Sequence, residues 1–230
     1  MPGLPFSDEE KRGVYRAIHE RRDVRGQFLP DPIPPELLGR ILNAAHHAPS
    51  VGFMQPWDFI VIEDRAVRSA VCRNFERANT SAAGAYDSEQ RESYRKMKLA
   101  GILDAPVNLC ITCDRQREWG RGLGRQTDPA TDLYSTVCAV QNLWLAARAE
   151  GVGVGWVSIL DFDELKSLLG IPAGHTLVAY LCVGYVSEFH TRPDLETQGW
   201  EHRQNLAALL HFDGWTDRDE RRAAALLEGC

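Results

Sequence analysis

The sequence predicts one domain that combines α-helices with β-strands. Apolar residues recur every three or four positions in several segments, as in helices, and form short continuous runs in others, as in strands. No internal repeat is present, and no convincing linker divides the 230 residues. A hydrophobic share of 44% and a charged share of 25% are typical of a soluble globular protein.

Composition and charge argue against several classes of protein. The formal net charge of −6 disfavours a nucleic-acid-binding protein, which usually carries a basic excess. No apolar run approaches the roughly 20 residues of a membrane-spanning helix, and residues 1–5 lack the features of a signal peptide. We therefore expect a cytoplasmic protein that binds neither nucleic acid nor membrane.

The six cysteines are expected to be reduced thiols. Cys110 and Cys113 have C-x-x-C spacing, but they lie in a predicted strand, where residues three apart face opposite sides. His46 and His47 are adjacent on a predicted helix and point in different directions. No second cysteine pair or suitably spaced histidine completes a tetrahedral site, so the sequence predicts no metal site.

The first predicted helix begins at Ser7, which forms a capping box with Glu10. Val14, Tyr15 and Ile18 follow at helical spacing and extend the helix. At its C-terminal end it carries what we call the arginine segment, residues 21–25. The members of this segment are Arg21, Arg22, Asp23, Val24 and Arg25.

The arginine segment has two interpretations. Guanidinium groups are planar forks of donors that suit phosphate oxygens, so three of them predict a bound phosphate. Asp23 is anomalous there, because a dianionic phosphate repels a carboxylate. Either the arginines neutralise Asp23 or the carboxylate is present for chemistry. The alternative is a solvated, self-paired charge cluster at the end of a helix.

An extended, proline-rich linker at residues 30–35 precedes a second predicted helix, which ends before Pro49. The buried face of that helix is expected to carry Leu37, Leu38, Ile41, Leu42 and Ala45. The loop at residues 48–57 comes next. Gly52 lets its backbone approach a ligand closely and expose its N–H. The loop is therefore either a ligand loop or an ordinary connection to the strand predicted at residues 58–62.

The middle of the chain alternates helices and strands. A helix is predicted at residues 66–77, followed by a polar stretch at residues 79–96 that is either a helix over a cleft or a mobile lid. Lys98, just beyond, either binds a phosphate or stays solvated. The strand at residues 107–113 leads into an irregular loop at residues 114–125, which either is flexible or folds over a site.

A long helix at about residues 132–150 is apolar around most of its circumference, so it is central or lies between subunits. Gly151 is expected to end it. A strand at residues 154–159 follows. Ser158, near the end of this strand, either binds a ligand or caps the backbone.

The last elements are a helix at residues 161–169 and a strand at residues 177–186, which is apolar on both faces and therefore interior. The tail, about residues 187–230, is too apolar to extend into solvent alone. We expect it to wrap over another surface, such as a second subunit.

Together these segments resemble the FMN-dependent nitroreductase superfamily and, within it, the BluB-type 5,6-dimethylbenzimidazole synthases. The resemblance runs from about residue 7 to residue 205. It is carried by the arginine segment and by residues 48–57, 134–145 and 153–159. Other nitroreductases typically have a small polar residue where this chain has Asp23.

The resemblance implies an α+β fold, a nitroreductase-like α/β sandwich with a central, mostly antiparallel sheet flanked by helices. It further implies an intertwined homodimer in which residues 1–230 form one FMN-binding domain and the tail, residues 187–230, extends over the partner subunit. The implied activity is that of an oxidoreductase of cobalamin biosynthesis.

In the implied reaction, reduced FMN is a substrate and dioxygen is the co-substrate. The products are 5,6-dimethylbenzimidazole, which is the lower ligand of vitamin B12, and erythrose 4-phosphate. NAD(P)H enters only indirectly, as the reductant of FMN, and whether a separate flavin reductase is a partner stays open.

The resemblance also implies roles for particular residues. Asp23 is the expected catalytic base near the junction of isoalloxazine and ribityl chain, and Ser158 is expected to orient the ring or relay a proton. Gly52 would offer its N–H to the oxygen that reacts above the ring. The expected cofactor-binding residues are Arg21, Arg22, Asp23, Val24, Arg25, Pro49, Ser50, Gly52, Lys98, Ser158 and Arg203.

Two rival functions remain open at this point. One is an NAD(P)H-dependent nitroreductase or flavin reductase, which returns FMN intact. The other is a non-catalytic flavin-binding module. Asp23 in place of a small polar residue argues against the reductase, whereas the module is distinguished by whether reduced FMN returns unchanged after air is admitted.

Overall fold

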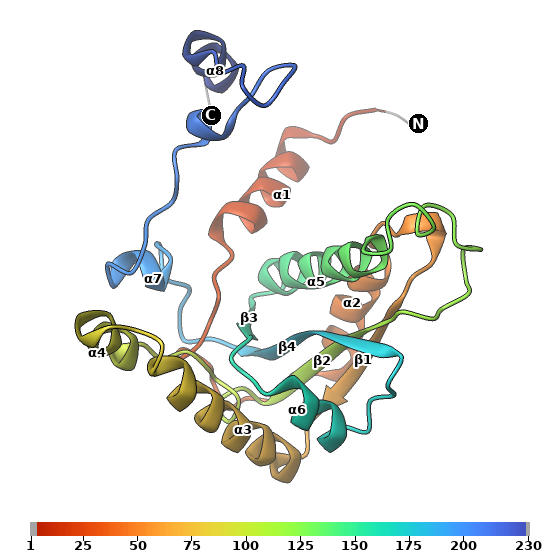
Figure 1. Cartoon of the computed structure of the whole chain (residues 1–230), viewed down its shortest axis with the longest axis vertical. Coiled ribbons are helices and arrows are strands. Elements are labelled where there is room, and N and C mark those ends of the chain that lie inside the picture. Colours follow the sequence, from red (N-terminus) through yellow and green to blue (C-terminus); the bar gives the residue numbers. More distant parts are fainter. Residues whose placement is uncertain (1–3, 229–230) are drawn as a thin grey trace. The chain divides into compact units, whose positions relative to one another are not determined.

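The computed structural model describes residues 4–228. Internal contacts divide the chain into two units, the first ending at Thr191 and the second beginning at Arg192. The first unit holds the β-sheet and helices α1 to α6 (Figure 1). The second unit holds the short helices α7 (Asp194–Thr197), η2 (Leu206–Leu209) and α8 (Glu220–Leu227). That its residues extend over a partner subunit stays a prediction.

Among the described residues, four strands form one antiparallel sheet in the order β1-β2-β4-β3. They are β1 (Trp57–Ile62), β2 (Val107–Asp114), β3 (Val152–Val157) and β4 (His175–Tyr185). The central strand β2 is buried at every position except Asp114, and β4 is buried continuously from Ala179 to Gly184. Strands covered on both faces appear in a sequence as continuous apolar runs. The interior strand predicted at residues 177–186 and the antiparallel sheet are thus confirmed.

Helices cover both faces of this sheet (Figure 1). On one face α2 and α5 pack around a core that contains Ile41, Leu109 and Leu143. On the other face α3 and α6 pack around a second core that contains Leu165 and Tyr180. The bounds are α2 (Pro35–His46), α5 (Thr131–Ala149), α3 (Arg65–Ala83) and α6 (Phe162–Leu168). The three layers are those of the predicted α/β sandwich.

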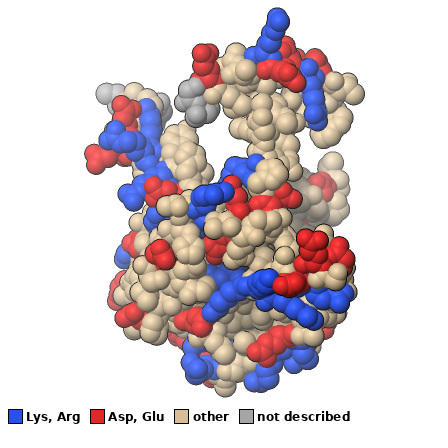
Figure 2. All heavy atoms as spheres, turned by 90° about the vertical axis from the view of Figure 1, so that its left-hand side faces the viewer, with Lys and Arg blue, Asp and Glu red and all other residues tan. Residues whose placement is uncertain are grey.

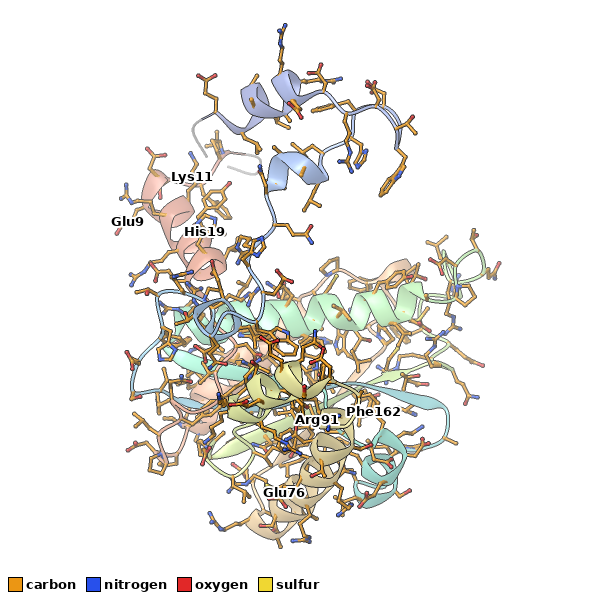
Figure 3. The ribbon with its side chains drawn as sticks, turned by 60° about the vertical axis from the view of Figure 1, so that its left-hand side comes forward. Glu9, Lys11, His19, Glu76, Arg91 and Phe162 are labelled. Atoms are coloured by element: carbon orange, nitrogen blue, oxygen red, sulfur yellow. The ribbon has the colours of Figure 1, made fainter. Side chains whose placement is uncertain are left out.

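The N-terminal helix α1 (Asp8–Glu20) begins with the predicted capping box between Ser7 and Glu10. None of its residues is buried. Figures 1 and 3 show it projecting from the sheet layers, with Glu9, Lys11 and His19 marking its course. Its apolar face is uncovered: the exposed fractions are 46% for Val14, 59% for Tyr15 and 42% for Ile18.

The polar stretch at residues 79–96 is largely helical. α3 continues through Ala83, and α4 (Ser88–Lys96) follows after a short turn. Arg91, labelled in Figure 3, donates to the carbonyl oxygens of Ala83 at 3.0 Å and Tyr86 at 2.7 Å. The two helices are therefore tied at their junction. Whether they close over a site stays a prediction.

β3 begins and ends two residues earlier than predicted, so Ser158 lies just beyond the strand. The strand starts at Val152 because Gly153 pairs with Gly184 in the ladder, although glycine carries no strand signal in a sequence. It ends because the chain turns toward Asp161, whose carboxylate caps α6 by accepting the N–H of Glu164 at 3.0 Å.

The described cysteines are free thiols. Cys110 belongs to the core beneath α3 and α6, whereas the Cys113 thiol interacts with Thr136 of α5, so the two face opposite sides as predicted. Burial raises the pKa of the Cys110 and Cys182 thiols to about 12, so neither is a nucleophile at neutral pH. Cys230 lies outside the described residues.

Residues 4–228 contain no group of three or more metal-ligating side chains placed to hold a metal ion. Nor does this part of the chain include a helix long and apolar enough to cross a bilayer.

Two glycines of β3 allow the arginine segment to lie directly against this edge strand. The N–H of Val24 donates to the carbonyl oxygen of Val154 at 3.0 Å, and Asp23 forms a parallel bridge with Val154. A Cβ on Gly155 would lie 2.0 Å from the carbonyl oxygen of Val24, and one on Gly153 would lie 2.4 Å from Val186. Larger residues at these positions would displace the segment.

We predict that Gly155→Ala displaces Val24 and lowers the free energy of unfolding by about 1–3 kcal/mol, the usual range for overpacking. Chemical denaturation measures the change. Gly39→Ala is the matched control, because Gly39 lies in α2 and a Cβ there meets nothing within 4 Å. The control should keep or slightly raise stability. Equal stability of Gly155→Ala and wild type would contradict the close approach.

Candidate flavin site

Arg22 holds the arginine segment to the main chain. Its Nη1 donates to the carbonyl oxygens of His19 at 2.8 Å and Arg21 at 2.6 Å, and its Nη2 donates to that of Thr191. These bonds join the end of α1 to the end of the first unit. Arg22 thus has a structural role, and its expected contact with phosphate stays a prediction.

Arg21 is placed differently. Its guanidinium carbon lies 5.1 Å from the ring centroid of Trp144, within the range of a cation–π contact. The indole N–H of Trp144 donates to the carbonyl oxygen of Arg22 at 3.2 Å. Among residues 4–228 no carboxylate forms an ion pair with Arg21. One aromatic side chain therefore supports the segment and holds this guanidinium beside it, with its donors available.

Both carboxylate oxygens of Asp23 accept hydrogen bonds. Its Oδ1 accepts the N–H of Trp156 at 2.8 Å, and its Oδ2 accepts Nη2 of Arg25 at 2.6 Å. The exposed fractions are 30% for the Asp23 side chain and 13% for that of Arg25. Nε of Arg25 is buried and has no hydrogen-bond partner in the described part of the chain. The segment thus combines an oriented carboxylate with a guanidinium that is incompletely satisfied.

The N–H of Trp156 binds Asp23, and Ser158 follows Trp156 by two residues, about 7 Å along an extended chain. Ser158 therefore lies near Asp23. Its side chain is exposed. It borders a groove of about 580 Å³ between α3 and the turn that leads to α6, together with Arg77 and Ser81. The structure therefore brings the two expected catalytic residues to the same end of β3.

Lys98 also lies beside the arginine segment. A Cβ on Gly26 would lie 3.4 Å from Cδ of Lys98, so the lysine stem passes this residue. Its Nζ, however, pairs with Asp104 at 2.5 Å, and the side chain is 54% exposed. The expected contact of Lys98 with the cofactor stays a prediction.

Pro49, Ser50 and Gly52 form a separate group. They lie on the loop that contains η1 (Val51–Phe53), and Ser50 Oγ accepts the N–H of Gln55 at 3.1 Å. The loop is attached to the N-terminal part of α5, where Ser135 Oγ accepts the N–H of Val51 at 3.0 Å. Trp144, which contacts the arginine segment, lies nine residues further along α5, about 14 Å at 1.5 Å per residue.

Arg203 lies in the second unit. It is exposed and borders a cavity of about 530 Å³ within that unit, together with Glu201 and Leu206. Its expected contribution to the phosphate clamp stays a prediction. Figure 2 shows Lys and Arg side chains interspersed with Asp and Glu on the face that it draws.

The sequence did not indicate Trp144 and Trp156 as parts of the site. Trp144 fits the apolar pattern of a central helix, and the contribution of Trp156 is its main-chain N–H, which has no signature in a sequence. The centroids of the two rings lie 6.3 Å apart. Only the packing of α5 against β3 reveals that both residues support the arginine segment.

Comparison with known proteins identifies the family of this chain. The model of the nitroreductase family matches residues 18–185. A 5,6-dimethylbenzimidazole synthase of Rhodospirillum rubrum is 43% identical over 202 residues, which cover 88% of this chain and 95% of that protein. One of Rhodobacter capsulatus is 39% identical over 198 residues, covering 86% and 95%.

Among solved structures, iodotyrosine deiodinase bound to FMN and 3-iodo-L-tyrosine superimposes with a TM-score of 0.66. It is 25% identical in sequence, and the match covers 77% of this chain and 91% of that chain. With its sandwich fold, its arginine segment beside β3 and a family match over most of its length, this chain belongs to the nitroreductase family.

Proposed function

We propose that this chain is a 5,6-dimethylbenzimidazole synthase, which uses dioxygen to fragment reduced FMN into 5,6-dimethylbenzimidazole and erythrose 4-phosphate. Two relatives with that name match this chain at 43% and 39% identity over 95% of their own length. The observation that carries the proposal is the placement of Asp23, a carboxylate held by two hydrogen bonds amid guanidinium groups. This carboxylate also pairs with Arg25, and a negative charge beside a bound phosphate would weaken phosphate binding, which favours a role for Asp23 in the chemistry.

The residues present fit FMN. Arg21 has an available guanidinium, and the buried Nε of Arg25 lacks an acceptor, as expected beside an anionic group. Ser158, exposed near Asp23, offers a hydroxyl at the same end of β3. FMN, when bound, supplies the ring system and the phosphorylated ribityl chain that the reaction takes apart.

In this proposal the residues of the site have different roles in the reaction. Arg21 and Arg25 bind the phosphate, while Arg22 and Val24 hold the segment in place. Asp23 accepts a proton at its carboxylate, which the N–H of Trp156 keeps oriented. Ser158 orients the ring or relays a proton through its hydroxyl. NAD(P)H serves only as the source of electrons for FMN.

We further propose that the site is completed in a homodimer. The loop of Gly52 and the arginine segment contact α5 nine residues apart, at Ser135 and Trp144, about 14 Å along the helix. This separation disfavours contact of both with the reacting part of one flavin within a single chain. A second copy would bring the loop of one chain to the arginine segment of the other. Uncovered apolar side chains support such an interface, with exposed fractions of 58% for Tyr134 and 43% for Val137 on α5 and 59% for Tyr15 on α1.

The activity is tested by adding chemically reduced FMN and air to the purified protein. We expect 5,6-dimethylbenzimidazole in the mass spectrum, together with loss of FMN. Steady oxidation of NAD(P)H with intact FMN over many turnovers would instead identify a reductase. Return of all FMN unchanged, without NAD(P)H oxidation, would identify a flavin-binding module.

We predict that Asp23→Asn still binds FMN but forms 5,6-dimethylbenzimidazole at least about 100-fold more slowly, the lower range for loss of a general base. The amide oxygen still accepts the N–H of Trp156, whereas the amide NH2 cannot accept Nη2 of Arg25, so the variant loses the charge together with this one hydrogen bond. Single-turnover rates and FMN titration measure the two effects. Glu150→Gln removes a carboxylate that pairs with Arg40 at the surface and serves as the control. A near wild-type rate for Asp23→Asn would refute its role as base.

The shared site predicts complementation between two inactive variants. Gly52→Ala places a Cβ 2.9 Å from the carbonyl oxygen of Leu123 at a residue with a φ of 55°, so it should distort the loop. When Asp23→Asn and Gly52→Ala chains are combined, the mixed dimer has one site with both wild-type residues. We expect about half of the wild-type activity per mixed dimer, purified with two different tags. Inactive mixed dimers would place both residues of each site in one chain.

A further inference from the structure

The turn at residues 51–55 is held in a backbone conformation that its residues disfavour. The φ angles are 55° for Gly52, 57° for Phe53 and 50° for Gln55. Glycine adopts positive φ readily, but other L-residues do so rarely, and a bulky residue such as Phe least of all. Such strain persists only where the surrounding structure enforces it.

Arg117 makes several hydrogen bonds at the C-terminal side of this turn, where Ser50 Oγ also accepts the N–H of Gln55. Nη1 of Arg117 donates to the carbonyl oxygens of Gln55 at 2.6 Å and Trp57 at 3.3 Å. Its Nη2 lies 2.8 Å from both carboxylate oxygens of Asp58, and its Nε bonds to Asp114 at 3.4 Å. One guanidinium thereby fixes the C-terminal side of the turn to the start of β1 and the end of β2.

The rest of the loop at residues 114–125 packs on the same turn. A Cβ on Gly120 would lie 2.5 Å from the carbonyl oxygen of Gly52, and one on Gly124 would lie 2.6 Å from Val51. Nη1 of Arg125 donates to the carbonyl oxygen of Arg117 at 3.2 Å and contacts the sulfur of Met54 at 3.7 Å. The loop, for which the sequence left flexibility open, therefore lies against the turn and reinforces Arg117.

We propose that Arg117 is a positioning residue that keeps the strained turn in the conformation in which Gly52 presents its N–H to the flavin. This inference rests on the proposed function. The guanidinium donates to Gln55, Trp57, Asp58 and Asp114, so it acts through the turn rather than on a ligand. Without it, Phe53 and Gln55 relax toward negative φ, and the N–H of Gly52 changes direction.

The direction of this N–H decides between two outcomes for reduced FMN. In the productive outcome the flavin is fragmented. In the unproductive one, two electrons and two protons pass from reduced FMN to dioxygen, which gives oxidised FMN and hydrogen peroxide. A donor held toward the reacting oxygen favours the first outcome. Release of the turn favours the second.

The first experiment compares Arg117→Ala with wild type after a single addition of reduced FMN and air. We expect the ratio of 5,6-dimethylbenzimidazole to hydrogen peroxide to fall at least about tenfold. In the absence of flavin, the rate of amide hydrogen exchange at residues 50–57 should rise at least about tenfold in Arg117→Ala. Arg40→Ala is the matched control, because Arg40 also binds a carboxylate through two nitrogens, at 2.8 Å and 3.1 Å from Glu150. It should leave both readouts unchanged.

A second experiment separates the conformation of the turn from general stability. In the Arg117→Ala background, Gln55→Gly removes the backbone strain at this position, whereas Gln55→Ala removes the same side-chain atoms beyond Cβ and keeps the strain. We expect Gln55→Gly to recover the product ratio at least about threefold and Gln55→Ala to recover none.

Unchanged exchange and an unchanged product ratio in Arg117→Ala would overturn the proposal, as would equal recovery by Gln55→Gly and Gln55→Ala. If wild type forms no 5,6-dimethylbenzimidazole, the proposed function fails, and the role of Arg117 in directing that reaction fails with it. The exchange experiment still decides separately whether Arg117 holds the turn.

Discussion

The close approach of the arginine segment to β3 is the contact on which the candidate site depends. A main-chain hydrogen bond from Val24 to Val154 aligns the segment with an edge strand, and this alignment places the N–H of Trp156 opposite Asp23. The approach is possible because residues 153 and 155 have no side chains. In this family member Gly153 and Gly155 therefore make room for the backbone of a neighbouring segment.

The three arginines of this segment lie within five positions, yet each makes a different kind of contact. Arg22 binds main-chain carbonyl groups, Arg25 binds Asp23, and Arg21 lies against Trp144. Since each guanidinium has several donors in a fixed plane, its neighbours determine how many remain for a ligand. The count of arginines in a motif therefore overstates the number available to bind phosphate.

Much of the fold could be predicted from local patterns. The capping box at Ser7, the apolar run of β4 and the nearly all-apolar α5 each have a signal within a few residues of sequence. The missed features depend on contacts between distant segments. The early start of β3 at Val152 follows from pairing between Gly153 and Gly184, and the support by Trp144 follows from helix packing. The contact of Arg117 with the turn depends on carbonyl groups some 60 residues away in the chain, so no local pattern indicates it.

α5 acts as a spacer, because it contacts the Gly52 loop at Ser135 and the arginine segment at Trp144. Each residue inserted in an α-helix advances it by about 1.5 Å and rotates it by about 100°. An insertion of one residue would thus turn one end of the helix away from its partner without much changing its length. The number of residues between Ser135 and Trp144 is therefore as constrained as the buried side chains between them, such as Ala139 and Leu143, which pack in the core.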